Sequence, residues 1–163
     1  MTAPTADPIL LRILTALCVP LRLITQANGF YHDVANVGIE PFAFNAQDSF
    51  QQIVVHEESG EIVDSTEDGF QDENVVAFHG FMKIASMASA YAEAHRFAAD
   101  MKRIAKSITR TTFDDGNGGS LVRSWSINQK HEIVPSELGE GFLEVIVRVS
   151  LDYRDFSPPV PGI

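Results

Sequence analysis

The sequence has a single cysteine, few basic residues and no long apolar run, and each shortage excludes a class of protein. One cysteine, Cys18, rules out an internal disulfide bond, so the fold must be held by its core. Twelve Lys and Arg residues stand against 22 Asp and Glu residues, giving a net charge of −10 that disfavours tight binding to nucleic-acid backbones. The longest uncharged stretch of the first apolar segment, Ile13 to Leu21, is well short of the roughly 20 residues that span a bilayer. We therefore expect a cytoplasmic protein with no membrane role, long enough at 163 residues to bury a core.

The sequence also lacks the motifs that usually mark catalytic, metal or cofactor sites. Cys18 lies outside any CxxC motif and without a basic neighbourhood, which favours a buried structural thiol over a nucleophile. The glycine-rich stretch from Asp114 to Gly119 lacks the spacing of a calcium loop, and it follows a helical segment, unlike a dinucleotide fingerprint. The histidines have no HExxH spacing; they are His32, His56, His79, His95 and His131. We expect no catalytic residues, no bound metal and no cofactor.

Two segments have the residue spacing of amphipathic helices. The apolar positions of the first recur at intervals of three and four: Leu10, Leu14, Leu17, Leu21 and Ile24. Asp7-Pro8 indicates its N-cap and first helical residue, Pro20 should kink or shorten it, and Asn28-Gly29 indicates its end. The second helix is predicted to run from a Ser86 or Ser89 cap to about Arg110.

The remaining segments favour strands. Three β-rich runs between the helices are predicted as strands: Phe30 to Val34, Phe50 to His56 and Val75 to Ile84. Two more follow the second helix, near Leu121 to Asn128 and from Phe142 to Tyr153, where aliphatic and polar residues alternate. These elements predict one α+β domain over residues 1–163, with a single antiparallel or mixed sheet, two helices on one face and the order α-β-β-β-α-β-β. The proline-rich tail 156–163 should be extended.

A dense acidic run separates the second and third predicted strands. Residues 57–73 carry eight acidic side chains and no base: Glu57, Glu58, Glu61, Asp64, Glu67, Asp68, Asp72 and Glu73. Such a run repels itself and predicts a solvated, mobile loop, with the acids forming an acidic surface or lining a lumen. Ile62, Val63 and Phe70 are candidate anchors through which this loop would become ordered on assembly.

The second predicted helix carries the main basic cluster: Arg96, Lys102, Arg103, Lys106 and Arg110. Most of these bases lie toward the C-terminal end of the helix, where they complement the helix dipole, and a solvated helix face explains the cluster without any function. The alternative is a docking surface for a neighbouring copy or a partner protein. On that alternative, reversing Arg103 and Lys106 to glutamate should weaken assembly and leave the fold intact.

Several landmarks along the chain resemble the tail terminator proteins of long-tailed bacteriophages. The apolar helix leads into Asn28-Gly29-Phe30-Tyr31-His32-Asp33-Val34, similar to the N-G-[FY]-x-x-D-[VI] stretch of that family, and a turn follows from Gly38 to Pro41. The middle helix with Ala98 to Ile104, and the last strand ending in Leu151-Asp152-Tyr153, are similar to the later landmarks. The likeness spans about Ile9 to Tyr153. The acidic run departs from it, since a shorter connection is usual in the family.

The resemblance implies a structural virion protein with no enzymatic step. Family members form a hexameric ring that caps the tail tube, stops its polymerisation and offers a surface to the head connector. The expected partners are therefore further copies of the chain, the tail tube protein and a neck protein. DNA would pass through the lumen without specific binding. The expected location of the protein is the virion tail, near the neck, after assembly in the host cytoplasm. Two alternatives stay open: another neck or tube component, or a small-ligand binding domain or enzyme unrelated to phages, which would need a concave apolar pocket.

Overall fold

The computed structural model describes residues 7–39, 51–66, 69–137, 139 and 141–155, and it confirms the predicted α+β class and element order. The elements are α1 (Ile9–Leu21), the 3-10 turn η1 (Gln26–Asn28), β1 (Val34–Ile39), β2 (Gln51–Thr66), β3 (Gly69–Lys83), α2 (Met87–Ser107), the 3-10 turn η2 (Arg110–Phe113), β4 (Val122–Pro135) and β5 (Phe142–Asp155). The five strands form one sheet in the order β1-β2-β3-β5-β4. Only β1 and β2 run parallel, so the sheet is mixed.

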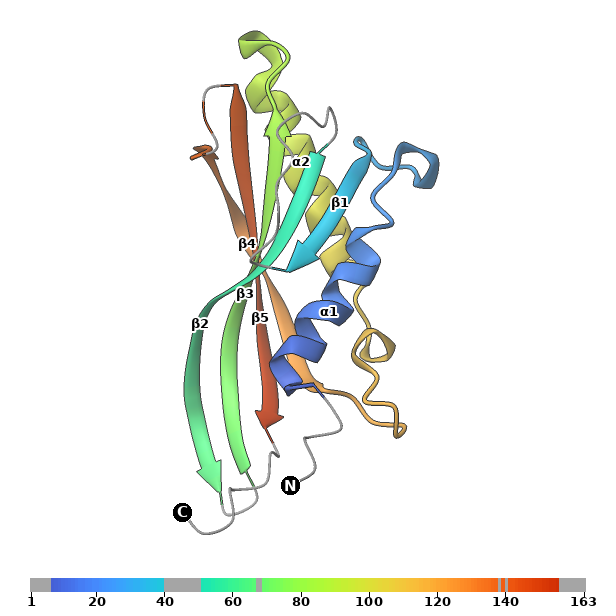
Figure 1. Ribbon diagram of the computed structural model, residues 1–163, viewed down its shortest axis with the longest axis vertical. Coiled ribbons are helices and arrows are strands. Elements are labelled where there is room, and N and C mark those ends of the chain that lie inside the picture. Colours follow the sequence, from blue (N-terminus) through green and yellow to red (C-terminus); the bar gives the residue numbers. More distant parts are fainter. Residues whose placement is uncertain (1–6, 40–50, 67–68, 138, 140, 156–163) are drawn as a thin grey trace.

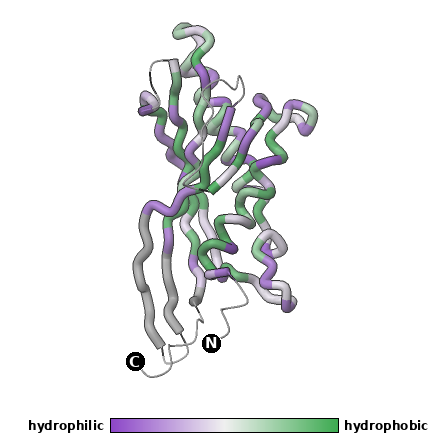
Figure 2. Tube along the Cα trace, in the orientation of Figure 1, coloured by the Kyte–Doolittle hydropathy of each residue, from purple (hydrophilic) through white to green (hydrophobic). Residues whose placement is uncertain are grey.

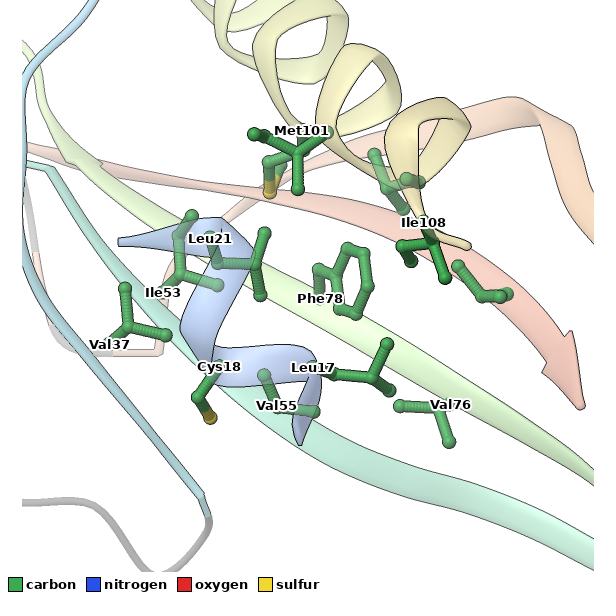
Figure 3. Packing of buried hydrophobic residues seen from close by; sticks show 14 of the residues in the cluster. Leu17, Cys18, Leu21, Val37, Ile53, Val55, Val76, Phe78, Met101 and Ile108 are labelled. Atoms are coloured by element: carbon green, nitrogen blue, oxygen red, sulfur yellow. The ribbon is translucent and has the colours of Figure 1, made fainter. Parts of the chain in front are cut away.

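Both helices lie on one face of this sheet, as the sequence predicts (Figure 1). The core between the two layers draws Leu17 and Leu21 from α1, Phe78 from β3 and Met101 from α2, and these side chains converge in Figure 3. Of the two helices, α1 is the more hydrophobic (Figure 2), while α2 is amphipathic. Gly80 lets α2 approach β3 closely, because a Cβ atom there would lie 2.5 Å from Cε1 of Phe97.

The first helix begins and ends differently from the prediction. Pro8 is its N-cap, so Asp7 does not cap it, and no side-chain hydrogen bond closes this end. The helix ends at Leu21, directly after Pro20, in agreement with the expected shortening. Gly29, with φ of 80°, ends the separate turn η1 instead of α1.

The predicted strand from Phe30 to Val34 is wrong, because β1 begins only at Val34. The backbone N–H groups of Tyr31 and His32 donate to the side chain of Asp100 on α2, so they are not available to a strand ladder. The later strands lie close to where the alternation predicts them, and β4 runs on to Pro135.

The acidic segment is a β-hairpin, and the prediction of a loop over residues 57–73 is wrong for 57–66 and 69–73. These residues pair from Glu57 with Val76 down to Thr66 with Gly69, with register shifts between Glu57 and Ser59 and between Ile62 and Asp64. Strand β3 also pairs with β5 along its whole length. Backbone pairing on both sides of β3 satisfies its amide and carbonyl groups whatever charge the side chains carry, and the sequence argument omitted this contribution.

Candidate interaction surfaces

Segment 28–33, which belongs to the first landmark of the resemblance, is fixed onto α2, the helix that carries the second landmark. The carboxylate of Asp100, a residue only 2% exposed, accepts hydrogen bonds from the backbone N–H groups of Tyr31 and His32, each at 3.1 Å. The next residue, Asp33, accepts a hydrogen bond at 2.8 Å from the backbone N–H of Gln26 and so closes η1. Segment 28–33 and the middle of α2 therefore form one structural unit.

The ring of His32 lies between two carboxylates in this unit. Nδ1 is 2.9 Å from Oδ2 of Asp100, and Nε2 is 3.0 Å from Oε2 of Glu93. Since an ionised carboxylate can only accept, both contacts are hydrogen bonds when both ring nitrogens carry a proton. Burial favours a higher pKa for Glu93, but hydrogen bonds from His32 and Arg96 outweigh it and hold this pKa below its usual value. The contacts tie His32 to two positions of α2 that lie about two turns apart.

Two of the predicted interface bases, Arg103 and Arg96, make contacts within the same unit. Arg103 donates to the carbonyl oxygen of Gly29 at 2.7 Å and lies over the Phe30 ring, 4.6 Å from its centroid. Arg96 pairs with Glu93 and lies 5.9 Å from the centroid of the Tyr31 ring. These two bases hold segment 28–33 against α2, a role that the periodicity of the helix does not reveal.

Lys102 and Lys106 lie on a different side of α2, and Arg110 follows in the turn η2. Lys102 donates to the carbonyl oxygen of Gln129 and to Nδ1 of His131 on β4, the latter at 2.9 Å. Lys106 and Arg110 are exposed, and among the described residues neither has a carboxylate partner. The five bases are thus not gathered on one surface, and their predicted role as an interface with another copy or the tube stays a prediction.

A polar network that the sequence analysis missed covers part of the sheet face opposite the helices. Arg148 on β5 donates to Glu58 through Nε at 2.5 Å and Nη2 at 3.0 Å, and to Glu132 through Nη1 at 2.7 Å. His79 pairs through Nδ1 with Glu144, and its Nε2 lies 3.8 Å from Oε1 of Glu58. The hydrogen bond from Arg148 holds the pKa of Glu58 below its usual value, and the same contact raises the pKa of Arg148.

This network joins residues that are far apart in sequence, which explains why sequence reasoning missed it. Only the alternation along β5, which puts Glu144 and Arg148 on the polar face, gave a signal. Their partners depend on the register, which sets His79 opposite Ile146 and Ala77 opposite Arg148. Ala77 and Ile146, which lie at these register positions, are buried.

The predicted acidic surface and its apolar anchors fall mostly on β2 and β3. Glu57, Glu58, Glu61 and Asp64 fall on β2, and Asp72 and Glu73 fall on β3. Ile62 and Val63 lie on β2 and Phe70 lies on β3, where Phe70 pairs with Ser65. Glu67 and Asp68, like the tail 156–163, lie outside the described residues.

Cys18 and the glycine-rich turn, considered above as a nucleophile and a calcium loop, have surroundings that fit structural roles. Cys18 is 2% exposed, and burial raises the pKa of its thiol, which opposes thiolate formation. Asp115 accepts hydrogen bonds from the backbone N–H groups of Asn117 and Gly119, which lower its pKa and close the turn. Within the described ranges, no three potential ligand side chains gather where they could hold a metal ion. No helix in this part of the chain is long and apolar enough to cross a membrane.

Comparisons with known proteins give structural likeness at low sequence identity. No family model matches the chain, and no curated protein matches it. A chain from the virion of a native gene transfer agent particle is 8% identical with a TM-score of 0.47, and the match covers 91% of this chain and 92% of that one. A second solved chain is 16% identical with a TM-score of 0.44, over 90% of this chain and 96% of its own length. Likenesses at this level carry no argument about function.

Proposed function

We propose that the chain is a structural virion protein of the tail terminator type. In this proposal, copies of the chain form a ring that caps the phage tail tube, ends its polymerisation and presents a surface for joining to the head. The partners are the tail tube protein and a neck protein, and DNA passes through the ring without specific binding. The chain performs no catalytic step.

One observation carries the proposal beyond sequence likeness alone. The stretch Asn28 to Val34 and the helical stretch Ala98 to Ile104 are separate landmarks of the resemblance, and in the fold they are held together by Asp100 and Arg103. Residues that distinguish this chain from an arbitrary α+β domain therefore belong to one structural unit. The structure also keeps the landmarks of the resemblance in their expected elements, a leading helix, a middle helix and a last strand.

Tail tubes from the phage that encodes this chain provide the test. Purified protein is first examined by light scattering and electron microscopy for closed rings, and is then added to growing tubes. We expect rings at tube ends and an arrest of elongation in proportion to the protein added.

Other outcomes would identify a different role. Self-polymerisation into long tubes would indicate a tube protein, and binding to filled heads but not to tubes would indicate a head-completion protein. A monomer with no effect on tube length would overturn the proposal. A tail tube of the same diameter from another phage serves as the specificity control.

A further inference from the structure

Three basic side chains converge where α2 meets the edge strand β4. The ring of His131 lies between the other two, with Nδ1 2.9 Å from Nζ of Lys102 and Nε2 2.9 Å from Nδ1 of His95. Since the ammonium group of Lys102 can only donate, Nδ1 of His131 accepts, and its protonated Nε2 donates to His95. Lys106 stands one turn further along α2 and is exposed. We call Lys102, Lys106, His95 and His131 the basic junction.

Within the described part of the chain, the lysines of the basic junction lack a counter-charge. Burial and the nearby Lys106 lower the pKa of Lys102, while burial, Lys102 and His95 lower the pKa of His131. Among the described residues, neither Lys102 nor Lys106 has a carboxylate partner within ion-pair distance. In a chain of net charge −10, two lysines with no carboxylate partner among the described residues are complementary to an acidic surface.

The acidic run lies toward the opposite edge of the sheet. Strand β1 pairs with β2 only as far as Ile39 opposite Val55, so in the part of the sheet that the structure describes β2 is the outer strand from His56 onward. The run begins immediately afterwards, at Glu57, whereas the basic junction lies at β4, the other edge (Figure 1). Opposite charges at opposite edges suit a head-to-tail contact, the kind that closes into a ring when successive copies are rotated.

We propose that the basic junction docks on the acidic β2–β3 hairpin of a second copy of the chain. The inference deepens the proposed function and rests on it, because it names the contact between neighbouring subunits of the ring. Nucleic acid is the competing anion. It fits less well, because backbone binding grows with the number of cationic contacts and this site offers two lysines in a strongly acidic protein.

Zero-length carbodiimide cross-linking tests the contact directly, since it joins a lysine amine to a carboxylate in direct contact. The full chain is assembled as an equal mixture of unlabelled and nitrogen-15-labelled copies, so that cross-links between copies carry both labels. We expect Lys106 or Lys102 joined to a glutamate or aspartate of residues 57–73 across copies. Cross-links of these lysines to other segments only, in a ring that forms normally, would overturn the inference.

Charge reversal supplies an independent measurement. Lys106→Glu should weaken assembly roughly tenfold, because it sets like charges against each other at the contact. Lys83→Glu, which changes the net charge equally at an exposed position on the far end of β3, should leave assembly unchanged. Adding Glu61→Lys and Asp64→Lys to Lys106→Glu should restore assembly at least in part.

The outcomes separate the inference from the function on which it rests. Rings that form with Lys106→Glu as well as with the parent chain overturn the inference and leave the capping role standing. A parent chain that stays monomeric at every concentration overturns both. Binding of a short fluorescent DNA duplex that is lost in Lys106→Glu but kept in Lys83→Glu would overturn the protein contact and identify the junction as a nucleic-acid site.

Discussion

Asp100 is the residue on which segment 28–33 most depends. Its buried carboxylate receives two backbone N–H groups and faces the His32 ring, so three donors converge on one charge. A buried carboxylate is favourable only where such donors replace its lost hydration. The pattern of apolar residues on α2 does not reveal this role, because Asp100 falls on the buried side of the helix among alanines and Phe97.

Replacing Asp100 by asparagine should therefore destabilise the protein. The amide keeps one oxygen acceptor, but it loses the charge and leaves a backbone N–H of the segment unsatisfied. We expect Asp100→Asn to lower the free energy of unfolding by about 2 kcal/mol, measured by urea denaturation. Asp114→Asn is the matched control, since its oxygen can still accept from Gly116 in an exposed turn. Equal stability of the two variants would contradict the role assigned to Asp100.

Glu58 gives a second prediction at this scale, concerning pH. Its folded-state pKa is depressed below the ordinary value of 4.5, mainly by the hydrogen bond from Arg148. The contact therefore stabilises the fold above that ordinary value, and the contribution is lost as the pH falls through the folded-state pKa. In urea denaturation, Glu58→Gln should be less stable than the parent chain at neutral pH, and the difference should shrink in acid. Glu137→Gln, at an exposed turn, is the matched control for the loss of one carboxylate.

At the scale of elements, β3 organises the molecule, since it pairs with β2 and β5 and faces α2. Gly80 sets the distance between this strand and the helix, and an added Cβ would lie 2.5 Å from the Phe97 ring and 3.0 Å from Cε of Met101. Gly80→Ala should lower the free energy of unfolding by about 1 to 3 kcal/mol, as overpacking does. Combining it with Phe97→Leu, which vacates that space, should cost less than the two single changes together. Strict additivity would show that the two residues do not compete for space.

The elements differ in how far the sequence predicts them. Periodicity predicts α1, α2 and β5 because each buries one face. Apolar residues therefore recur about every 3.6 residues in the helices and every 2 residues in the strand. It fails at segment 30–33, where the partner of the backbone is a side chain on α2, and at the acidic hairpin, where the partners are two other strands. Both failures involve hydrogen bonds to distant residues, as does the network around Arg148. The basic cluster was predicted as a set, but its division depends on which side of α2 each residue occupies.

The acidic hairpin should consequently be protected before any assembly. Amides of β3 bond to strands on both sides, so we expect residues 70–73 of the acidic run to exchange slowly with deuterium in the free subunit. The Gly116 to Gly119 turn provides a fast-exchanging reference in the same sample. Exchange in β3 as fast as in that turn would contradict the strand and support the mobile loop that the charge of the segment predicts.

At the scale of the whole molecule, two bases of α2 allow the effects of charge on folding and on association to be measured separately. Arg103 holds Gly29 and Phe30, whereas Lys106 is exposed and makes no such contact. The same change of charge at the two positions should therefore have different effects. We therefore expect charge reversal to spare the fold at Lys106 but not at Arg103.

Arg103→Glu should lower the free energy of unfolding by roughly 1 to 2 kcal/mol, because it removes a charge-assisted hydrogen bond and a cation–π contact. For a chain of this length, that corresponds to a melting temperature lower by about 2 to 8 °C. Lys106→Glu should leave the melting temperature nearly unchanged and weaken assembly at low salt, with a smaller effect at high salt where exposed charges are screened. Thermal melts and light scattering on the same samples measure both quantities. A Lys106→Glu protein that melts as early as Arg103→Glu would show that both bases support the fold and that neither reports on association alone.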